Sequence, residues 1–266
     1  MQSLARRVDL SNPELVKEYL ARATFSESRK LRLVHELIRF YKWKGIQFEA
    51  PHYRHMDKLP FIPLESEIDS LISGSGRKTA SLLLLLKETG MRVGEAWSAK
   101  WTDLDFERSL IIVRPEKGSN SRALKVSNRL ISMINLLPKT SPFIFRLVSQ
   151  DPITSLLYAR RNFERQRKRL AEKLQNPRLM QIHFHTLRHF KATMEYQKTR
   201  DILHVMRLLG HRNIMHTLTY THLVDFHSDD YICKVAKTVN EVTALIESGF
   251  EYATDFQDTK LFRKRK

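Results

Sequence analysis

Six side chains between residues 92 and 220 are of the types that metal-free phosphodiester chemistry requires. Such chemistry needs cations around the non-bridging oxygens, a nucleophile, and an acid for the leaving oxygen. Arginine suits the first task because its planar guanidinium binds phosphate oxygens and stays charged. The candidates are two arginines, one lysine, two histidines and a tyrosine: Arg92, Lys117, His185, Arg188, His211 and Tyr220.

The local sequence around these candidates could present them to one phosphate. Arg92 follows a Thr-Gly-Met segment at the expected start of a helix, and Glu95, three residues on, could accept a hydrogen bond that holds it. His185 and Arg188 lie one helical turn apart and share a helix face. Lys117 lies at the tip of an expected hairpin turn, where a flexible ammonium could reach into a groove.

Metal and nucleotide chemistry are disfavoured. Eight histidines crowd residues 183–227, but there is no His-Glu-x-x-His helix, few carboxylates lie nearby, and the chain has one cysteine, Cys233. The eight glycines form no phosphate-binding Gly-x-x-x-x-Gly-Lys-Ser/Thr loop. We therefore expect no cofactor and no metal.

The charge of the chain indicates a polyanionic partner. Its 266 residues carry 46 Lys and Arg against 29 Asp and Glu, a formal net charge of +17. Phosphate contacts reward such an excess because they release counterions; the alternative is that the charge merely keeps the protein soluble. Residues 160–173 are the densest basic stretch, with seven basic and two acidic residues. This stretch is either a solvated helix or a helix that faces DNA. In the second case the candidate DNA contacts are Arg160, Arg161, Arg165 and Lys168.

Several classes of protein are excluded by the apolar and cysteine patterns. The longest apolar run, Leu82 to Leu86, is far short of the ~20 residues that span a membrane. No apolar stretch follows the basic pair near the N-terminus, so we expect no signal peptide. A single cysteine excludes an internal disulfide and indicates a reducing compartment. We expect a cytoplasmic, nucleoid-associated protein.

The pattern of elements predicts a mainly α protein with a small β-hairpin or sheet (α+β). Apolar residues at helical spacing and a capping Asn12-Pro13 pair predict short N-terminal helices over 11–48, and prolines mark a linker over 49–63. Residues 110–113 and 123–126 predict a hairpin around the turn at 115–120. The other expected helices span about 128–137, 153–175, 186–197, 201–209 and 229–247. The expected domains are a helical region 1–48, a linker 49–63, a catalytic domain 64–250 and a basic tail 251–266.

Taken in order, the six candidates resemble the catalytic set of the tyrosine recombinases, the family of phage-type integrases and Xer recombinases. That family's pattern is an arginine, a hairpin lysine, His-x-x-Arg, a histidine after Leu-Gly, and a nucleophilic tyrosine. The lysine follows Arg92 by 25 positions (117 minus 92), His211 follows Arg188 by 23, and Tyr220 follows His211 by nine. The resemblance covers residues 62–225, and residues 191–209 are similar to archaeal members.

The resemblance implies a catalytic domain of that family behind a reduced core-binding region, and a role for each residue. Tyr220 would attack a DNA phosphate to form a 3′-phosphotyrosyl link without metal or ATP. Lys117 would protonate the leaving oxygen, although Arg114, Arg122 and Lys125 compete for that place. His185 would act as base or orienting group, whereas His189 is interpreted as structural. The remaining members would stabilise charge on phosphorus: Arg92, Arg188 and His211.

The resemblance also implies partners. They are double-stranded DNA with specific recombination sites and three further copies of the chain on that DNA, the free protein being a monomer or weak oligomer; no membrane is involved. The expected C-terminal helix could dock on a neighbouring copy or close its own core, through these apolar residues: Ile232, Val235, Val239, Val242 and Ile246. Two other functions stay open: type IB topoisomerase-like DNA relaxation, and a non-catalytic DNA-binding relative of the integrases.

Overall fold

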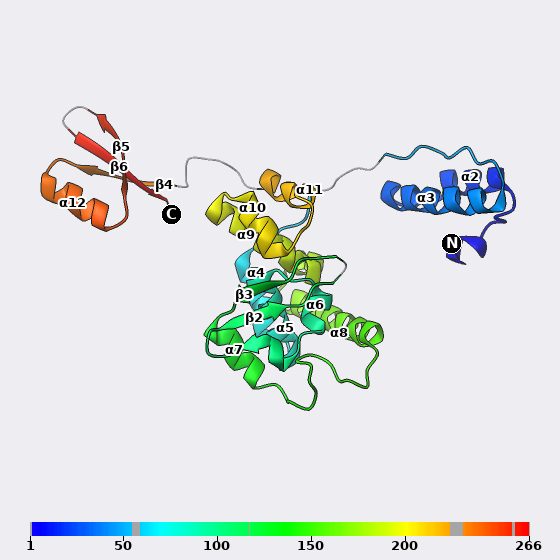
Figure 1. Ribbon diagram of the computed structural model, residues 1–266, viewed down its shortest axis with the longest axis horizontal. Helices are drawn as coiled ribbons and strands as arrows, with labels where there is room; N and C mark the ends of the chain where they lie inside the picture. Colours follow the sequence, from blue (N-terminus) through cyan, green and yellow to red (C-terminus); the bar gives the residue numbers. More distant parts are fainter. Residues whose placement is uncertain (1, 55–58, 117, 224–230, 257–258, 266) are drawn as a thin grey trace. The chain divides into compact units, whose positions relative to one another are not determined.

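The computed structural model describes residues 2–54, 59–116, 118–223, 231–256 and 259–265 (Figure 1). Lys117 therefore lies outside the described residues. The chain divides into two compact units, Met1–Leu59 and Pro60–Lys266.

The first unit is helical, as the sequence predicts for residues 11–48. It contains α1 (Gln2–Ala5), α2 (Pro13–Arg22) and α3 (Glu27–Lys44). The Asn12 side chain accepts hydrogen bonds from two amides of the first turn of α2, and Pro13 opens that helix. Its small core is built from residues at helical spacing that are at most 3% exposed: Leu4, Val16, Leu20, Val34, Leu37 and Tyr41.

The second unit is built around α5 (Arg77–Thr89), whose leucines 82–86 are all buried. A helix that is apolar all round belongs inside a core. It contacts α4 (Glu65–Ser73), α6 (Val93–Trp97), α7 (Asn128–Asn135) and α9 (Phe184–Thr199). Figure 1 shows α5 among these elements near the centre of this unit.

The predicted hairpin is present and belongs to a three-stranded antiparallel sheet. β2 (Leu110–Val113) pairs with β3 (Arg122–Lys125), with Ile111 opposite Leu124. A short strand β1 (Leu104–Asp105), which the sequence analysis did not predict, follows the 3-10 turn η1 (Trp101–Asp103) and pairs with β2. Ile111 and Val113 are fully buried, so this sheet is fixed to the core by one face of β2.

The elements that carry the remaining candidates follow the sheet. They are α8 (Pro152–Lys173), the 3-10 turn η2 (Pro177–Gln181), α9, α10 (Ile202–Leu209), α11 (Met215–Leu218) and the 3-10 turn η3 (Thr219–Leu223). α9 contacts α5, α10 and η3. Because α9 touches all three, side chains from distant parts of the sequence meet along it.

The C-terminal residues correct two predictions. The helix expected over 229–247 is wrong in its first part, because residues 231–236 form strand β4 (Tyr231–Ala236) and α12 spans Val239–Glu247. The apolar residues expected on one helix face, with Ile232 and Val235 among them, are therefore divided between a strand and a helix. The basic tail expected over 251–266 is likewise wrong for the described residues, which form β5 (Glu251–Phe256) and β6 (Thr259–Arg265).

The physical reason is long-range pairing. β6 pairs with both β4 and β5, giving the strand order β4-β6-β5, and α12 contacts β4 and β5. Phe262 of β6 is 1% exposed and forms a small core with Ala236 and Phe250. The run of basic residues that suggested a tail thus surrounds a buried aromatic side chain.

The predicted fold class, mainly α with small β-sheets, is confirmed. Among the residues described, no helix combines the length and apolar character needed to cross a membrane.

Candidate active site

The corner between α5 and α6 fixes Arg92. Gly90 ends α5 with a left-handed backbone (φ 64°), and Arg92 then caps α6. Glu95 accepts a hydrogen bond from the Arg92 amide at 2.9 Å, and its other carboxylate oxygen lies 3.3 Å from Arg92 Nη1. Glu95 is therefore a hydrogen-bond acceptor for both the amide and the side chain of Arg92.

Glu95 is buried and has a second arginine partner. Arg122 Nη2 lies 2.8 Å from its carboxylate. Burial alone would raise the pKa of Glu95, but the hydrogen bonds from Arg122 and the Arg92 amide outweigh burial and hold that pKa below its ordinary value. The carboxylate therefore stays ionised beside both guanidinium groups.

Arg188 on α9 is 2% exposed and joins two helix ends. Its Nη1 donates to the carbonyl of Gly90 at 2.7 Å, and its Nη2 donates to the carbonyl of Leu209 at 2.8 Å. Burial, followed by the charge of Arg92, lowers the pKa of Arg188 to about 10, so the group remains charged at neutral pH. Arg188 thus brings the segment before Arg92 and the segment before His211 to one place.

The start of α9 is held by a residue that the sequence analysis did not single out. Arg167 on α8 is 5% exposed, donates to the carbonyl of Ile182 at 2.6 Å, and lies 2.9 Å from His183 Nδ1. The His183 amide in turn donates to the Thr186 hydroxyl at 3.0 Å, which caps the helix. These bonds fix the first turn of α9, on which His185 lies.

His211 follows the end of α10, where Gly210 adopts a left-handed backbone (φ 69°). Its Nδ1 lies 2.9 Å from the hydroxyl of the fully buried Thr217. Burial lowers the pKa of His211 to about 3, and the charges of Arg188 and Arg92 contribute. His211 is therefore neutral at pH 7, and an acceptor role at Nδ1 leaves a proton on Nε2 that can be donated.

Tyr220 lies on η3 and is 3% exposed. It packs with residues of α9 and α10, among them Tyr196 and Leu209. Burial raises the pKa of its hydroxyl, whereas the nearby charges of Arg188 and Arg92 act to lower it. The charges of both arginines therefore act on the Tyr220 hydroxyl.

His189, interpreted from the sequence as structural, contacts the hydroxyl of Tyr220. Its Nδ1 lies 3.1 Å from the Tyr220 oxygen. Burial lowers the pKa of His189 to about 4, and His185 and Arg188 add to the effect. The sequence signal that could have suggested this place is its spacing of four residues from His185, which puts both rings on one helix face.

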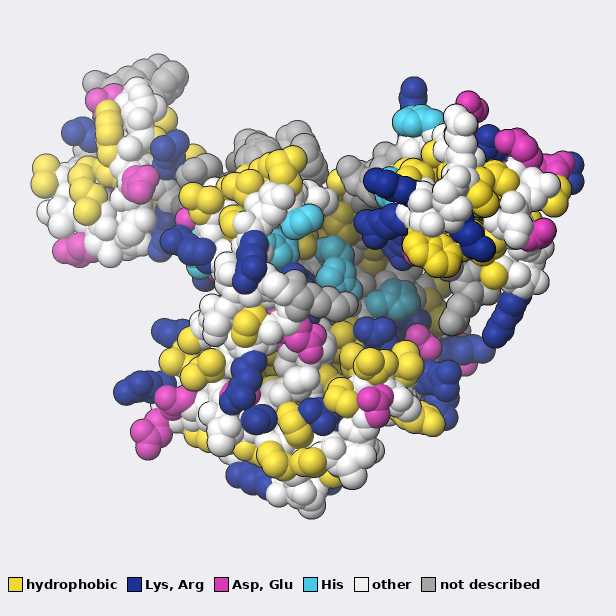
Figure 2. All heavy atoms as spheres, turned by 45° about the vertical axis from the view of Figure 1, so that its right-hand side comes forward, with side chains coloured by type: hydrophobic (Ala, Val, Ile, Leu, Met, Phe, Trp, Pro, Cys, Tyr) yellow, Lys and Arg dark blue, Asp and Glu magenta, His cyan; other side chains and the backbone are white. Residues whose placement is uncertain are grey.

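His185 contacts the ring of His189. Its ring meets the His189 ring edge-on, with centroids 4.6 Å apart. Its side chain lines a cavity of about 650 Å³ together with Arg92, Gly94 and Arg160. Desolvation in this recess lowers the pKa of His185, and Arg188 and Arg92 lower it further. Figure 2 shows histidine side chains gathered near its centre with Lys and Arg side chains beside them.

The arginines that competed with Lys117 are engaged elsewhere. Arg114 pairs with Asp103 at 2.7 Å. Arg122, besides pairing with Glu95, donates from Nε to the carbonyl of Leu208 at 2.8 Å. Neither guanidinium is therefore free to act as the acid at a leaving oxygen.

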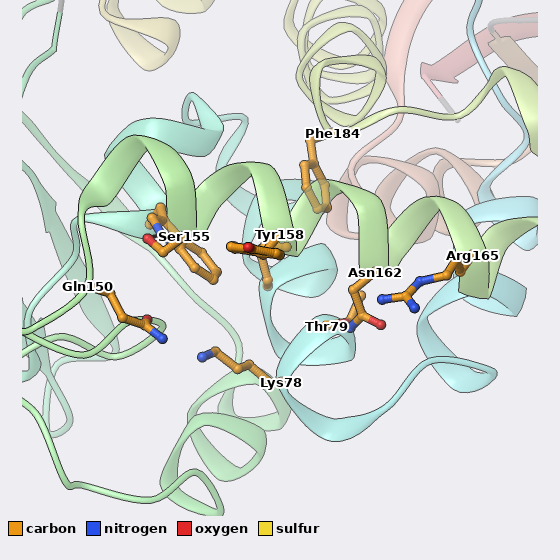
Figure 3. A pocket seen from close by; sticks show the side chains of 11 residues that line it. Lys78, Thr79, Gln150, Ser155, Tyr158, Asn162, Arg165 and Phe184 are labelled. Atoms are coloured by element: carbon orange, nitrogen blue, oxygen red, sulfur yellow. Dashed lines mark hydrogen bonds between the residues drawn. The ribbon is translucent and has the colours of Figure 1, made fainter.

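The candidate DNA contacts on α8 are all exposed: Arg160, Arg161, Arg165 and Lys168. Arg165 also lines a cavity of about 330 Å³ between α8 and the start of α5. In Figure 3, Lys78 and Gln150 point toward each other at one end of this cavity, and Asn162 and Arg165 lie at the other. Arg160 of α8 lines a different cavity, the one of about 650 Å³ that Arg92 and His185 also line. The surface of α8 next to that second cavity is therefore basic.

Within the described part of the chain, no three His, Cys, Asp or Glu side chains are grouped so that they could hold a metal ion.

Comparison with known proteins gives a consistent result. Residues 64–227 match the phage integrase family. The chain is 29% identical to the tyrosine recombinase XerA of Pyrococcus horikoshii over 229 residues, covering 80% of this chain and 76% of the relative. It is 28% identical to XerA of Thermococcus onnurineus over 214 residues, covering 75% and 73%.

Solved structures share the fold. The structure of the Tn1549 transposon integrase in complex with transposon right end DNA has a TM-score of 0.61 and 18% identity, covering 91% of this chain and 86% of that one. The XerH site-specific recombinase bound to its difH substrate has a TM-score of 0.59 and 22% identity, covering 79% and 67%. These recombinases and integrases do not favour the topoisomerase or the non-catalytic alternative. The chain therefore belongs to the phage integrase family and is a tyrosine-type site-specific recombinase.

Proposed function

We propose that Tyr220 attacks a scissile DNA phosphate, forms a 3′-phosphotyrosyl link and releases a 5′-hydroxyl. The observation that carries this proposal is the pair of hydrogen bonds that Arg188 donates to the carbonyls of Gly90 and Leu209. It brings the segments of Arg92 and His211 together beside the buried hydroxyl of Tyr220. A nucleophile with two guanidinium groups close by is the arrangement that phosphoryl transfer needs.

The cationic and neutral donors have separate tasks in this proposal. Arg92 and Arg188 bind the non-bridging oxygens, and His211 donates from Nε2 to the charge that develops on them. Removing one such preorganised donor costs about 10²–10³ in rate. Lys117 protonates the leaving 5′ oxygen; its neighbours in the hairpin, Arg114 and Arg122, are occupied by carboxylates, which supports its assignment.

The covalent link explains how strands are exchanged without an energy source. The phosphotyrosyl ester retains the energy of the broken phosphodiester, so a 5′-hydroxyl from a second duplex can attack it and release Tyr220. The proposed reaction therefore needs neither ATP nor a metal ion.

We infer that the substrate is double-stranded DNA carrying specific sites. The basic surface of α8 supports this, because its exposed Arg160 lines the same cavity as Arg92 and His185. The helical first unit, with basic residues along α3, would contact the DNA backbone. Four copies would act on two DNA sites, and each copy would be a monomer or weakly associated before it binds. Because its substrate is DNA, we propose that the enzyme acts at the nucleoid in the cytoplasm.

The test is covalent trapping. Fragments of the source genome are nicked at random and incubated with the protein, and adducts that survive denaturing electrophoresis are recovered to identify the site. A nicked duplex carrying that site is then compared for wild type, Tyr220→Phe and Tyr196→Phe. Tyr196 is buried in the same cluster and is the matched control. Adduct formation is expected for wild type and Tyr196→Phe and should be lost in Tyr220→Phe; adduct from Tyr220→Phe would refute the assignment.

A further inference from the structure

Helix α9 presents two histidines, one turn apart, whose rings face different groups. The His185 and His189 rings meet edge-on at 89°, with centroids 4.6 Å apart. His185 lines the cavity that Arg92 also lines. His189 lies 3.1 Å from the hydroxyl of Tyr220. His185 therefore borders the cavity beside Arg92, whereas His189 contacts the proposed nucleophile.

The hydroxyl of Tyr220 needs a proton acceptor, and among the described residues two groups are considered: His189 and Glu95. Among the hydrogen bonds of the residues that the structure describes, His189 is its partner. Glu95, the buried carboxylate of the site, is occupied by Arg92 and Arg122. A base must lie within hydrogen-bond reach of the proton that it removes, and His189 meets that condition.

We propose that His189 is the base that accepts the proton of Tyr220 during attack on DNA. The inference rests on the proposed function and adds the residue that activates the nucleophile. As the bond from the Tyr220 oxygen to phosphorus forms, its O–H bond breaks and the proton moves to His189 Nδ1. The bond from phosphorus to the 5′ oxygen breaks with its electron pair, and that oxygen takes a proton from a separate acid, for which Lys117 is the candidate. In the reverse step, His189 returns its proton to Tyr220.

His189 is uncharged at neutral pH in the structure. Burial keeps its pKa far below neutral, and the groups that face it, His185 and Arg188 on its own helix, add to this effect. His189 is therefore free to accept a proton at pH 7. Burial raises the pKa of the Tyr220 hydroxyl, which faces His189 from η3, and the charges of Arg188 and Arg92 oppose that rise. A DNA phosphate bound at the arginines would bring negative charge close to His189, which favours its protonated form.

The test separates proton transfer from packing. His189→Asn places an amide near the position of Nδ1 and keeps a hydrogen bond to Tyr220, but it cannot take a proton. His189→Ala also removes the hydrogen bond and leaves space for added imidazole. His204→Asn is the matched control, because His204 bonds to Glu195 of the same helix at 2.9 Å without reaching Tyr220. The probe is the nicked duplex recovered by covalent trapping, and the readouts are DNA affinity and the single-turnover rate of adduct formation from pH 6 to 9.

The wild-type rate is expected to vary little with pH from 6 to 8. His189→Asn should bind DNA with wild-type affinity but cleave about 10²–10³-fold more slowly, within the range of general-base effects. Its rate should rise about tenfold per pH unit, because hydroxide must now ionise Tyr220. Imidazole should restore part of the rate of His189→Ala, and His204→Asn should keep the wild-type profile.

A His189→Asn protein with the wild-type rate and pH profile would overturn the inference and leave the proposed function intact. The inference would also be overturned if the tenfold rise in rate per pH unit appeared in His185→Asn and not in His189→Asn. That result would assign the role of proton acceptor to His185. If wild type itself forms no adduct with any fragment, the proposed function fails and this inference with it.

Discussion

The Arg122 guanidinium on β3 lies 2.8 Å from the Glu95 carboxylate on α6, and neither side chain is appreciably exposed (7% and 0%). Arg122 also donates to the carbonyls of Leu208 and Asn120, at 2.8 and 3.1 Å. One side chain therefore joins the residue that holds Arg92, the hairpin turn, and the end of α10 just before His211. Arg122 therefore adds a second link, beside that of Arg188, between the segments that carry Arg92 and His211.

Replacing Arg122 should consequently affect both stability and catalysis. Arg122→Gln leaves the buried Glu95 without its strongest partner, and breaking a buried ion pair costs about 3 kcal/mol or more. We expect a loss of about that size in the free energy of unfolding, measured by urea denaturation, and a fall of at least about tenfold in single-turnover cleavage.

Arg114→Gln is the matched control, because Arg114 is another hairpin arginine with a carboxylate partner but is 58% exposed. Its partner Asp103 is buried, but that carboxylate also accepts a hydrogen bond from the Lys100 amide, and the Arg114 guanidinium reaches solvent. We therefore expect a smaller loss of stability than for Arg122→Gln. Equal losses in the two variants would show that Arg122 has no special position.

Gly210 should be intolerant of a side chain. Its φ is 69°, and an added Cβ would lie 2.6 Å from Arg122 Nη1, 2.7 Å from the Ser119 hydroxyl and 3.0 Å from the Asn120 carbonyl. Gly210→Ala should therefore destabilise the protein and displace the hairpin turn. Gly45 has a φ of 70° but nothing within 4 Å of an added Cβ, so Gly45→Ala reports the backbone cost alone, about 1–2 kcal/mol. Thermal denaturation should show a larger loss for Gly210→Ala, and the same loss in both would argue against the contact.

Acid should destabilise the catalytic unit through its buried histidines. The pKa is lowered to about 4 for His189 and to about 3 for His211, against about 6.5 in an unfolded chain. Between these values the unfolded chain binds more protons than the folded one, so stability falls as the pH drops below about 6.5. Each fully shifted histidine contributes at most about 1.4 kcal/mol per pH unit.

Urea denaturation between pH 7 and 5 measures this dependence directly. The His189→Asn variant should show a shallower loss of stability than wild type across that range, because one of the titrating groups is gone. A stability that is constant over this range would contradict the neutral state assigned to both histidines.

The basic surface of α8 should contribute to DNA affinity through phosphate contacts. Each phosphate contact that is removed should reduce the slope of log K against log salt by about one. Arg161→Ala together with Lys168→Ala is therefore expected to weaken binding and lower the slope by about two, measured by fluorescence anisotropy on a duplex carrying the trapped site. Arg108→Ala with Arg129→Ala removes two exposed basic residues of the second unit that lie outside α8, and serves as a charge-matched control. Equal effects of the two double variants would indicate bulk charge rather than contact.

The parts of this account that the sequence could predict are those set by local chemistry. Apolar residues at 110–113 and 123–126 around a polar turn predict the hairpin, and Gly210 after Leu209 predicts a helix end. The three-residue separation of Arg92 and Glu95 suffices to suggest their hydrogen bond. Each of these depends on residues within one turn or one hairpin of each other.

The parts that could not be predicted depend on pairing across the chain. His189 and Tyr220 are 31 positions apart, and their contact requires η3 to pack on α9. Val235 and Val239 fit a helical repeat, but β4 pairs with β6, which places Val235 opposite Leu261, 26 residues further on (261 minus 235). This pairing decides in favour of a strand. The role of Arg122 was likewise hidden, because its partners lie on α6 and α10.

The most direct test of the central claim is the chemical identity of the protein–DNA link. Wild-type adduct trapped on the nicked duplex is digested with nuclease and protease, and the peptide that retains nucleotide is sequenced by mass spectrometry. The account predicts a 3′-linked nucleotide on the hydroxyl of Tyr220. A nucleotide on any other residue, or a link through the 5′ phosphate, would contradict it.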